Sequence, residues 1–232
     1  MNAFKKGLGL RIILHVQKLK ERNSLLWPLA CGLVAATAFL QGCSQERIAA
    51  TRPEDPVLLA RKERDLAFRS SPQSPIPPQE RMRFKGLDYF LIKPELRFRV
   101  RLNRYPAPER VRLGTNTGEM RDGLRYGSFE FVAEGQACRL QVYRLDDSAN
   151  SGQPYLFIPF RDATTGTETY SAGRYLDLPE NTSGIYDLDF NRAYNPLCAY
   201  GEGYSCPIAP DENRLPVPIR AGEKNYAPAH NH

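Results

Sequence analysis

The chain has 232 residues, of which 41% are hydrophobic and 25% are charged. This composition is that of an ordinary globular protein, and it excludes a disordered, collagen-like or disulfide-dense chain. The formal charge of +6 comes mainly from residues 1–42, which hold six basic and one acidic side chain, because residues 43–232 hold 26 basic and 25 acidic ones. A nearly neutral body has no broad field that attracts nucleic acid, so no nucleic-acid partner is predicted.

The first 42 residues resemble a secretory signal peptide. An uncharged run of 16 residues, 25–40, follows a basic stretch and is shorter than the roughly 20 residues of a membrane-spanning helix. It ends at Leu40-Gln41-Gly42-Cys43, which resembles the bacterial lipobox, where the cysteine thiol receives a diacylglycerol and becomes the mature N-terminus. We therefore predict a lipoprotein-type signal peptide over 1–42 and lipidation, with palmitate-like acyl chains, at Cys43.

Two other interpretations of this leader remain open: an uncleaved membrane anchor, and cleavage at another site. All three place the rest of the chain outside the cytoplasm. We expect a bacterial cell-envelope protein that faces the periplasm and is attached to the membrane through its lipid. Ser44, rather than an aspartate, follows the cysteine, and this favours the outer membrane.

After a polar tether over 43–54, the sequence predicts one domain over 55–224 and a flexible tail over 225–232. Asp55 and Pro56 are typical of a helix start, and good helix formers follow, so a helix is expected over 56–69. Its partly apolar face consists of Leu58, Leu59, Lys62, Leu66 and Phe68. The proline-rich stretch 70–80 must end this helix and is expected to form an ordered or polyproline-like turn.

From Phe84 onward the hydrophobic period changes to two, which indicates antiparallel strands. Strands are expected at 96–103, 110–115, 125–133, 137–145, 154–160, 169–178 and 184–190, with a short last one at 216–221. Turns are expected at 116–118 and 134–136, and Pro159 should confine its strand to a sheet edge or a strand end. The predicted fold is mainly β: a single antiparallel β-sandwich or open-barrel-like domain with one N-terminal helix.

Histidine provides strong negative evidence about chemistry. The three histidines are His15 in the leader and His230 and His232 in the tail. The body therefore cannot assemble a Ser–His–Asp triad, a Cys–His pair or a histidine-ligated metal site without help from the tail. The cysteine spacing also lacks any CxxC pair, so we predict no metal and no cofactor.

Three cysteines lie in the body. Cys198 and Cys206 could form a local disulfide in an oxidising compartment, or they could be two buried thiols. Cys138 alternates with Leu140 and Val142 on an expected strand, so we interpret it as a small core residue.

Polar groups concentrate between Phe160 and Cys206. The candidates are Arg161, Asp162, Thr169, Tyr170, Arg174, Tyr175, Asp189, Asn191, Arg192, Tyr194 and Asn195. Arg174 and Arg192 could bind a carboxylate or phosphate, and a buried aspartate could act as a general base. The same residues could equally form a structural network, since Asp and Asn cap turns and Arg–Asp pairs join loops to strands. The catalytic residue, if there is one, is unknown.

Several long segments carry a family resemblance: FKGLDYF, PFRDATTGTETYSAGRYLDL, FNRAYNPLCAY and SCPIAPDENRLPVPIRAGEK. Read in order, they resemble the bacterial family called domain of unknown function 1684, from about Asp55 to Lys224. The resemblance implies that Glu212 and Asn213 belong to the same pattern as the polar candidates, and it implies no established activity. We expect a non-catalytic binding or envelope-assembly module, with a polar ligand or an envelope protein as partner; the alternative is a carboxylate-based enzyme acting on a polar small molecule or glycan.

Overall fold

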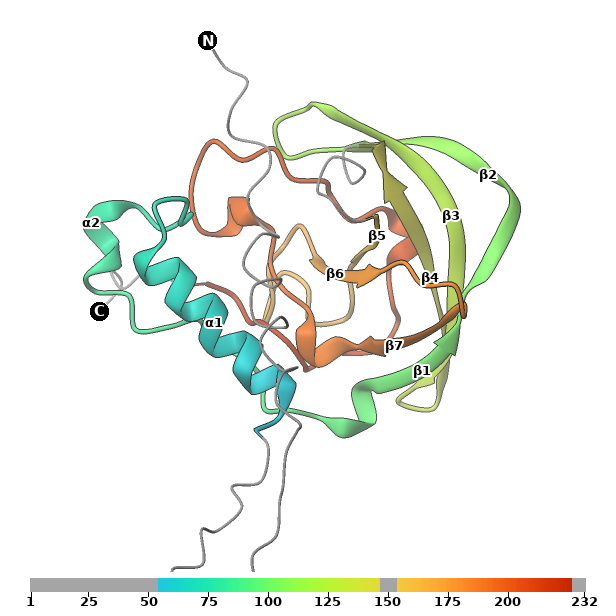
Figure 1. Ribbon diagram of the computed structural model, residues 1–232, viewed down its shortest axis with the longest axis horizontal. Coiled ribbons are helices and arrows are strands. Elements are labelled where there is room, and N and C mark those ends of the chain that lie inside the picture. Colours follow the sequence, from blue (N-terminus) through green and yellow to red (C-terminus); the bar gives the residue numbers. More distant parts are fainter. Residues whose placement is uncertain (1–53, 147–153, 227–232) are drawn as a thin grey trace, which may run out of the picture. The chain divides into compact units, whose positions relative to one another are not determined.

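The computed structural model describes residues 54–146 and 154–226. The signal peptide, Cys43, nearly all of the tether and most of the tail lie outside the described residues. Within them, two antiparallel sheets and one main helix make up a mainly β body (Figure 1). This arrangement confirms the predicted fold class and is consistent with a β-sandwich. In the part of the chain described, no helix is both long and apolar enough to cross a bilayer.

Helix α1 spans Pro56–Ser70, as the sequence predicted. The Asp55 side chain accepts a hydrogen bond from the Val57 N–H at 2.8 Å and caps the helix, and Pro56 occupies the first turn, where no N–H is needed. The predicted apolar face is wrong for Leu59 and Leu66, which are 50% and 60% exposed. Phe68 is buried as predicted, together with Val57, which the prediction left out.

The short helix α2, Pro78–Arg81, and a 3-10 turn, Pro94–Leu96, follow the proline-rich turn. The strands are β1 Arg97–Arg101, β2 Asn103–Gly114, β3 Met120–Ala133, β4 Gln136–Leu145, β5 Tyr155–Phe160, β6 Arg174–Pro179 and β7 Ile185–Asp189. Further 3-10 turns lie at Phe190–Arg192 (η3), Leu197–Ala199 (η4) and Asp211–Asn213 (η5). The expected hairpin turns at 116–118 and 134–136 join β2 to β3 and β3 to β4.

Five strands pair antiparallel in the order β2-β3-β4-β5-β6, and β1 pairs with β7 in a separate sheet. In Figure 1 the long strands β2, β3 and β4 curve around one side of the body, while α1 lies on the opposite side. The main core includes Val100 of β1, Phe129 of β3, Leu140 of β4 and Leu188 of β7, so it lies between the two sheets. A smaller cluster around Phe68 holds α1 against the body.

The sequence allowed Pro159 either an edge strand or a strand end. Strand β5 is an interior strand, so the edge position is wrong. Pro159 is the next-to-last residue of the strand, so the strand-end position is confirmed. Because Pro159 has no N–H, the sheet needs another donor near it. The buried Asn213 provides it: its Nδ2 donates to the Pro159 carbonyl at 2.7 Å and to the Gln141 carbonyl at 2.9 Å, while its Oδ1 accepts from the Gln141 N–H at 2.6 Å. One side chain from η5 thus joins β4 to β5.

No strand forms over the expected segment 216–221. Two prolines, Pro216 and Pro218, remove backbone donors, so this segment cannot form a continuous ladder. It is nevertheless part of the core, because Val217 and Ile219 are buried. Its carbonyls accept hydrogen bonds from other groups, such as the Ala163 N–H at 3.3 Å.

Candidate functional site

A buried ion pair lies where β6 begins. Arg174 Nη2 donates to Asp162 Oδ2 at 2.9 Å and to the Ile219 carbonyl at 2.7 Å. Its Nη1 donates to the carbonyls of Glu223, at 3.1 Å, and Ala221. The side chains of the pair are 1% exposed. Burial lowers the pKa of Arg174, and the charge of Asp162 opposes that shift.

Two glycines allow this crowded arrangement. Gly173 adopts a φ of +97°, and a Cβ there would lie 2.6 Å from the Phe160 carbonyl oxygen. Gly222 adopts a φ of +78° between the two carbonyls that Nη1 contacts. The other partner, Asp162, accepts from the Thr164 N–H at 2.7 Å and from its hydroxyl at 2.6 Å, and Thr164 in turn contacts the Thr169 hydroxyl at 3.0 Å. Because protein groups hold both charges, these contacts favour the structural interpretation of Arg174 and Asp162.

A second polar group lies around Asn191. Its Oδ1 accepts from the Lys93 N–H at 2.8 Å, and its Nδ2 donates to the Lys93 carbonyl at 2.9 Å and to Asp189 Oδ1 at 2.8 Å. Arg192 is 48% exposed, and its Nε lies 3.9 Å from Asp189 Oδ2. Arg192 therefore lies at the surface, and the structure does not bury it beside Arg174 as one anion-binding pair.

A third group surrounds the buried carboxylate of Glu223. It accepts from Arg64 Nε at 2.5 Å, from the Asn195 N–H at 2.7 Å and from the Tyr200 hydroxyl. Burial alone would lower the pKa of Arg64, but the Glu223 carboxylate raises it above its usual value. The Arg64 guanidinium also lies 5.1 Å from the centre of the Tyr194 ring. This cluster fastens α1 to the C-terminal segment.

Glu212 is less buried than these groups. Its Oε1 accepts from the Tyr143 hydroxyl at 2.8 Å and from Arg125 Nη2 at 2.7 Å. Partial burial raises its pKa, but the hydrogen bonds from Tyr143 and Arg125 outweigh burial and lower it. Glu212 is therefore ionised at neutral pH and neighbours the strand-joining Asn213.

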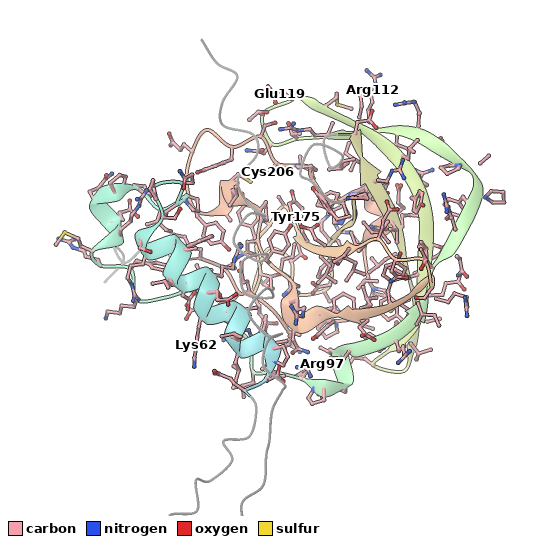
Figure 2. All side chains as sticks on the ribbon, in the orientation of Figure 1. Lys62, Arg97, Arg112, Glu119, Tyr175 and Cys206 are labelled. Atoms are coloured by element: carbon pink, nitrogen blue, oxygen red, sulfur yellow. The ribbon has the colours of Figure 1, made fainter. Side chains whose placement is uncertain are left out.

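The five-stranded sheet has a second face, opposite the main core, that is unusually aromatic. Its residues form a buried cluster, Leu113, Tyr143, Leu145, Phe157 and Tyr175, with the partly buried Val111, Tyr155 and Tyr194 packed against them; we call this set the aromatic face. Tyr175 and Tyr194 pair through their backbones at 2.9 and 3.1 Å, and their rings meet edge to face. The Tyr175 hydroxyl donates to the Pro207 carbonyl, which places this ring beside the segment that carries Cys206 (Figure 2).

A second carboxylate lies beside the aromatic face, next to Tyr194. Asp177 of β6 is exposed, and its Oδ2 accepts from the Tyr194 hydroxyl at 2.5 Å. Desolvation by the surrounding protein raises the pKa of Asp177 to about 6, although the Tyr194 hydrogen bond and the Arg64 charge lower it. Asp177 thus combines solvent access with a carboxylate that titrates near neutral pH.

Cys198 and Cys206 are free thiols, so the structure contains no disulfide between them. They are nevertheless neighbours, because the Cys198 N–H donates to Cys206 Sγ at 3.4 Å. The Tyr170 hydroxyl lies 3.7 Å from Cys198 Sγ. Cys138 is a buried free cysteine in the main core, as the strand alternation predicted.

Sequence reasoning missed three of these residues: Arg64, Glu223 and Asp177. Helical spacing could have indicated Arg64, because it lies seven positions after Val57 and four before Phe68, on the face that α1 buries. Strand alternation could have indicated Asp177, which is two residues after Tyr175 on the same face of β6. Glu223 lies in the last of the segments that carry the family resemblance, but it was not singled out there. Within residues 54–146 and 154–226, no three His, Cys, Asp or Glu side chains gather as metal ligands would.

Comparison with known proteins supports the family resemblance. A family described as "Protein of unknown function (DUF1684)" matches residues 82–224. The solution NMR structure of an uncharacterized protein from Haloarcula marismortui is 36% identical, with a TM-score of 0.57, and the match covers 76% of this chain and 94% of that one. No curated protein matches the sequence. The chain therefore belongs to the DUF1684 family of proteins of unknown function.

Proposed function

We propose that this protein is a lipid-anchored cell-envelope protein whose body is a non-catalytic binding module. The lipobox-like Leu40-Gln41-Gly42-Cys43 supports attachment through Cys43 and a periplasmic location. The body between residues 54 and 226 contains no histidine, which removes the commonest acid–base group. Its partners are the membrane, through the lipid, and a polar ligand or envelope protein at the exposed Asp177 beside the aromatic face.

The observation that carries the binding role is the accessible Asp177 carboxylate on the aromatic face. The buried candidates are held by the protein itself: Arg174 by Asp162 and three carbonyls, and Glu223 by three donors. Asp177 differs, since one tyrosine hydroxyl contacts one of its oxygens and the residue stays exposed. A carboxylate has acceptor capacity beyond that one bond.

The chemistry of this face suits a particular kind of group. A carboxylate attracts hydrogen-bond donors and cations, and the half-buried Tyr194 beside it adds an aromatic ring, whose π face attracts cations. Arg64, the nearby positive charge, is already neutralised by Glu223 at 2.5 Å. We therefore expect the polar ligand to present an amine or a similar donor group to Asp177.

The test is a thermal-shift screen of the full-length protein against amines, amino sugars and cell-wall fragments. A ligand present at about a hundred times its Kd should stabilise the fold by about 2.7 kcal/mol. Asp177→Asn should abolish the shift, because the amide keeps the shape and loses the charge. Asp187→Asn is the matched control, since Asp187 is an exposed aspartate on β7. A shift that survives Asp177→Asn would refute the assignment of the site.

A carboxylate-based enzyme acting on a polar small molecule or glycan is the second candidate. The raised pKa of Asp177, about 6, favours it, because a general acid or base works best near the operating pH. Arg64 and Asp177 also both contact Tyr194, which gives a carboxylate and a guanidinium around one ring. Turnover of a bound ligand that disappears in Asp177→Asn, with a pH limb near 6, would identify the protein as an enzyme.

A further inference from the structure

The two thiols near the end of the chain form a pair with unequal surroundings. Cys198 lies in η4 and is half-buried, whereas Cys206 is 8% exposed. The Cys198 N–H donates to Cys206 Sγ at 3.4 Å, and the Tyr170 hydroxyl lies 3.7 Å from Cys198 Sγ. We propose that Cys198 and Cys206 are a redox-active dithiol that thiol–disulfide exchange converts to an intramolecular disulfide, with Cys198 as the attacking sulfur and Cys206 as the resolving sulfur.

Hydrogen bonds single out Cys198 as the nucleophile. The Cys206 thiol and the Tyr170 hydroxyl both stabilise its thiolate, and against the opposing effect of burial they lower the pKa of Cys198 to about 7. The same contact raises the pKa of Cys206, because its proton is held between the two sulfurs. A thiol whose pKa is near ambient pH combines a large thiolate fraction with high nucleophilicity. Cys198 is also the more exposed of the two.

The backbone around the pair keeps the sulfurs together. The Cys206 N–H donates to Asn116 Oδ1 at 2.7 Å, and the Asn116 N–H donates back to the Cys206 carbonyl at 3.1 Å. Two residues later, the Ile208 N–H donates to the Gly114 carbonyl at 2.8 Å. Cys206 is thus fixed to the β2–β3 hairpin, and Cys198 meets it across a connection of seven residues, 199–205.

The oxidant in this exchange is a low-molecular-weight disulfide, such as glutathione disulfide. The Cys198 thiolate attacks one sulfur of the oxidant, its S–S bond breaks, and one thiolate leaves. Cys206 then loses its proton and attacks the Cys198 sulfur, which breaks the mixed disulfide and releases the second thiolate. The two protein thiols are oxidised, the oxidant disulfide is reduced to two thiols, and the protons pass to those products.

The test begins with the full-length protein, reduced and then treated with glutathione disulfide. After alkylation of the remaining thiols, mass spectrometry of its peptides should show a Cys198–Cys206 disulfide in the wild type. Cys206→Ser should accumulate glutathione on Cys198, whereas Cys198→Ser should leave Cys206 as a thiol. Cys138→Ser is the control and should oxidise like the wild type. Cys198→Ala and Cys206→Ala repeat the measurement if a serine variant fails to fold.

The pH dependence provides a second, independent readout. The pH dependence of the Cys198 alkylation rate should differ between the wild type and the Cys206→Ala variant. Only the wild type keeps the hydrogen bond from Cys206 that stabilises the Cys198 thiolate. In the wild type the rate should rise with a midpoint near pH 7, and Tyr170→Phe should move that midpoint upward. Failure of the folded wild type to form the disulfide, or glutathione trapped equally on either cysteine, would overturn the proposal. A disulfide that glutathione cannot reduce would also overturn it, because the bond would then be structural.

Discussion

At the scale of single residues, Arg174 and Arg192 show how differently two arginines of one sequence region are used. Both were candidates for binding an anion. Arg174 is 1% exposed and paired with an equally buried Asp162, whereas the Arg192 side chain is 48% exposed. Removing one partner of a buried pair leaves an uncompensated charge, while exposed pairs contribute little. Replacing each arginine by the same residue should therefore change the stability of the protein by very different amounts.

We expect Arg174→Met to destabilise the protein by about 3–5 kcal/mol, because Asp162 loses its charge partner and three carbonyls lose a donor. Arg192→Met should change stability by less than about 0.5 kcal/mol. Urea unfolding followed by far-ultraviolet circular dichroism measures both. Equal midpoints for the two variants would show that the buried pair does not hold the fold.

Asp177 should make stability depend on pH. Its pKa is raised from 3.8 to about 6 in the folded protein, so the folded state binds the proton more tightly than the unfolded state. This contribution to stability is fully present below pH 3.8 and is lost as the pH rises through about 6.

Asp177→Asn removes that dependence, since the amide does not titrate. Relative to the wild type, the variant should therefore gain thermal stability as the pH rises from 4 through about 6. Thermal unfolding over that range, with Asp187→Asn as the control, gives the difference curve. A difference that is flat with pH would mean that Asp177 titrates as an ordinary surface aspartate.

At the scale of elements, helix α1 shows what can and cannot be read from sequence. Its bounds followed from local chemistry, since Asp55 caps it and Pro56 starts it. Its buried face did not, because hydrophobicity alone favoured Leu59 and Leu66, which are exposed. The helix docks through Arg61 and Arg64, whose partners lie far along the chain. Hydrophobic periodicity cannot detect a helix face whose contacts with the body include hydrogen bonds and an ion pair made by arginines.

Arg64→Met should loosen α1, because the variant keeps the aliphatic stem and leaves the buried Glu223 carboxylate without its counter-charge. The expected loss is about 3 kcal/mol, with faster hydrogen exchange across residues 56–70. Arg69→Met is the matched control, since Arg69 lies exposed in the last turn of the same helix. Identical exchange in the two variants would contradict this role of Arg64.

For the strands too, features with local causes could be predicted from the sequence and features with long-range causes could not. Period-two patterning predicted that β1 to β7 exist, because alternation is a property of each strand by itself. The predicted bounds were wrong for three strands: β2 begins at Asn103 and not at 110, β3 begins at Met120 and not at 125, and β6 begins at Arg174 and not at 169. It could not predict that β5 is interior, since that depends on Asn213 reaching from η5 to the Pro159 carbonyl. The segment 216–221 failed as a strand for a local reason, its two prolines. Much of the candidate site was predicted as a set of residues, but its division into buried clusters and the exposed carboxylates of Asp177 and Glu212 depends on long-range contacts.

At the scale of the whole molecule, the net charge of the body bears on how the protein could be held at a membrane. Residues 43–232 are nearly neutral, with 26 basic and 25 acidic side chains. A neutral body gains little from anionic lipid headgroups, so its membrane attachment depends on the acyl chains that we propose at Cys43.

We expect Cys43→Ser to lose metabolic labelling by a fatty acid and to leave the membrane fraction, because each buried methylene contributes ~0.8 kcal/mol to anchoring. Cys31→Ser is the matched control, since Cys31 lies within the apolar run and should keep the label. The measurement is labelling of cells that produce the full-length chain, followed by membrane fractionation. A labelled Cys43→Ser protein would rule out this anchor.

The position of Arg174's acceptors in the chain also bears on how the core is completed. Three of them are carbonyls at 219, 221 and 223, and Leu215, Val217, Ile219 and Ala221 of the same segment fill the main core. The main core is therefore complete only when residues 215–223 are in place. Until then the buried Arg174 has Asp162 as a partner but lacks its three carbonyl acceptors, so we expect the body to fold cooperatively and not strand by strand.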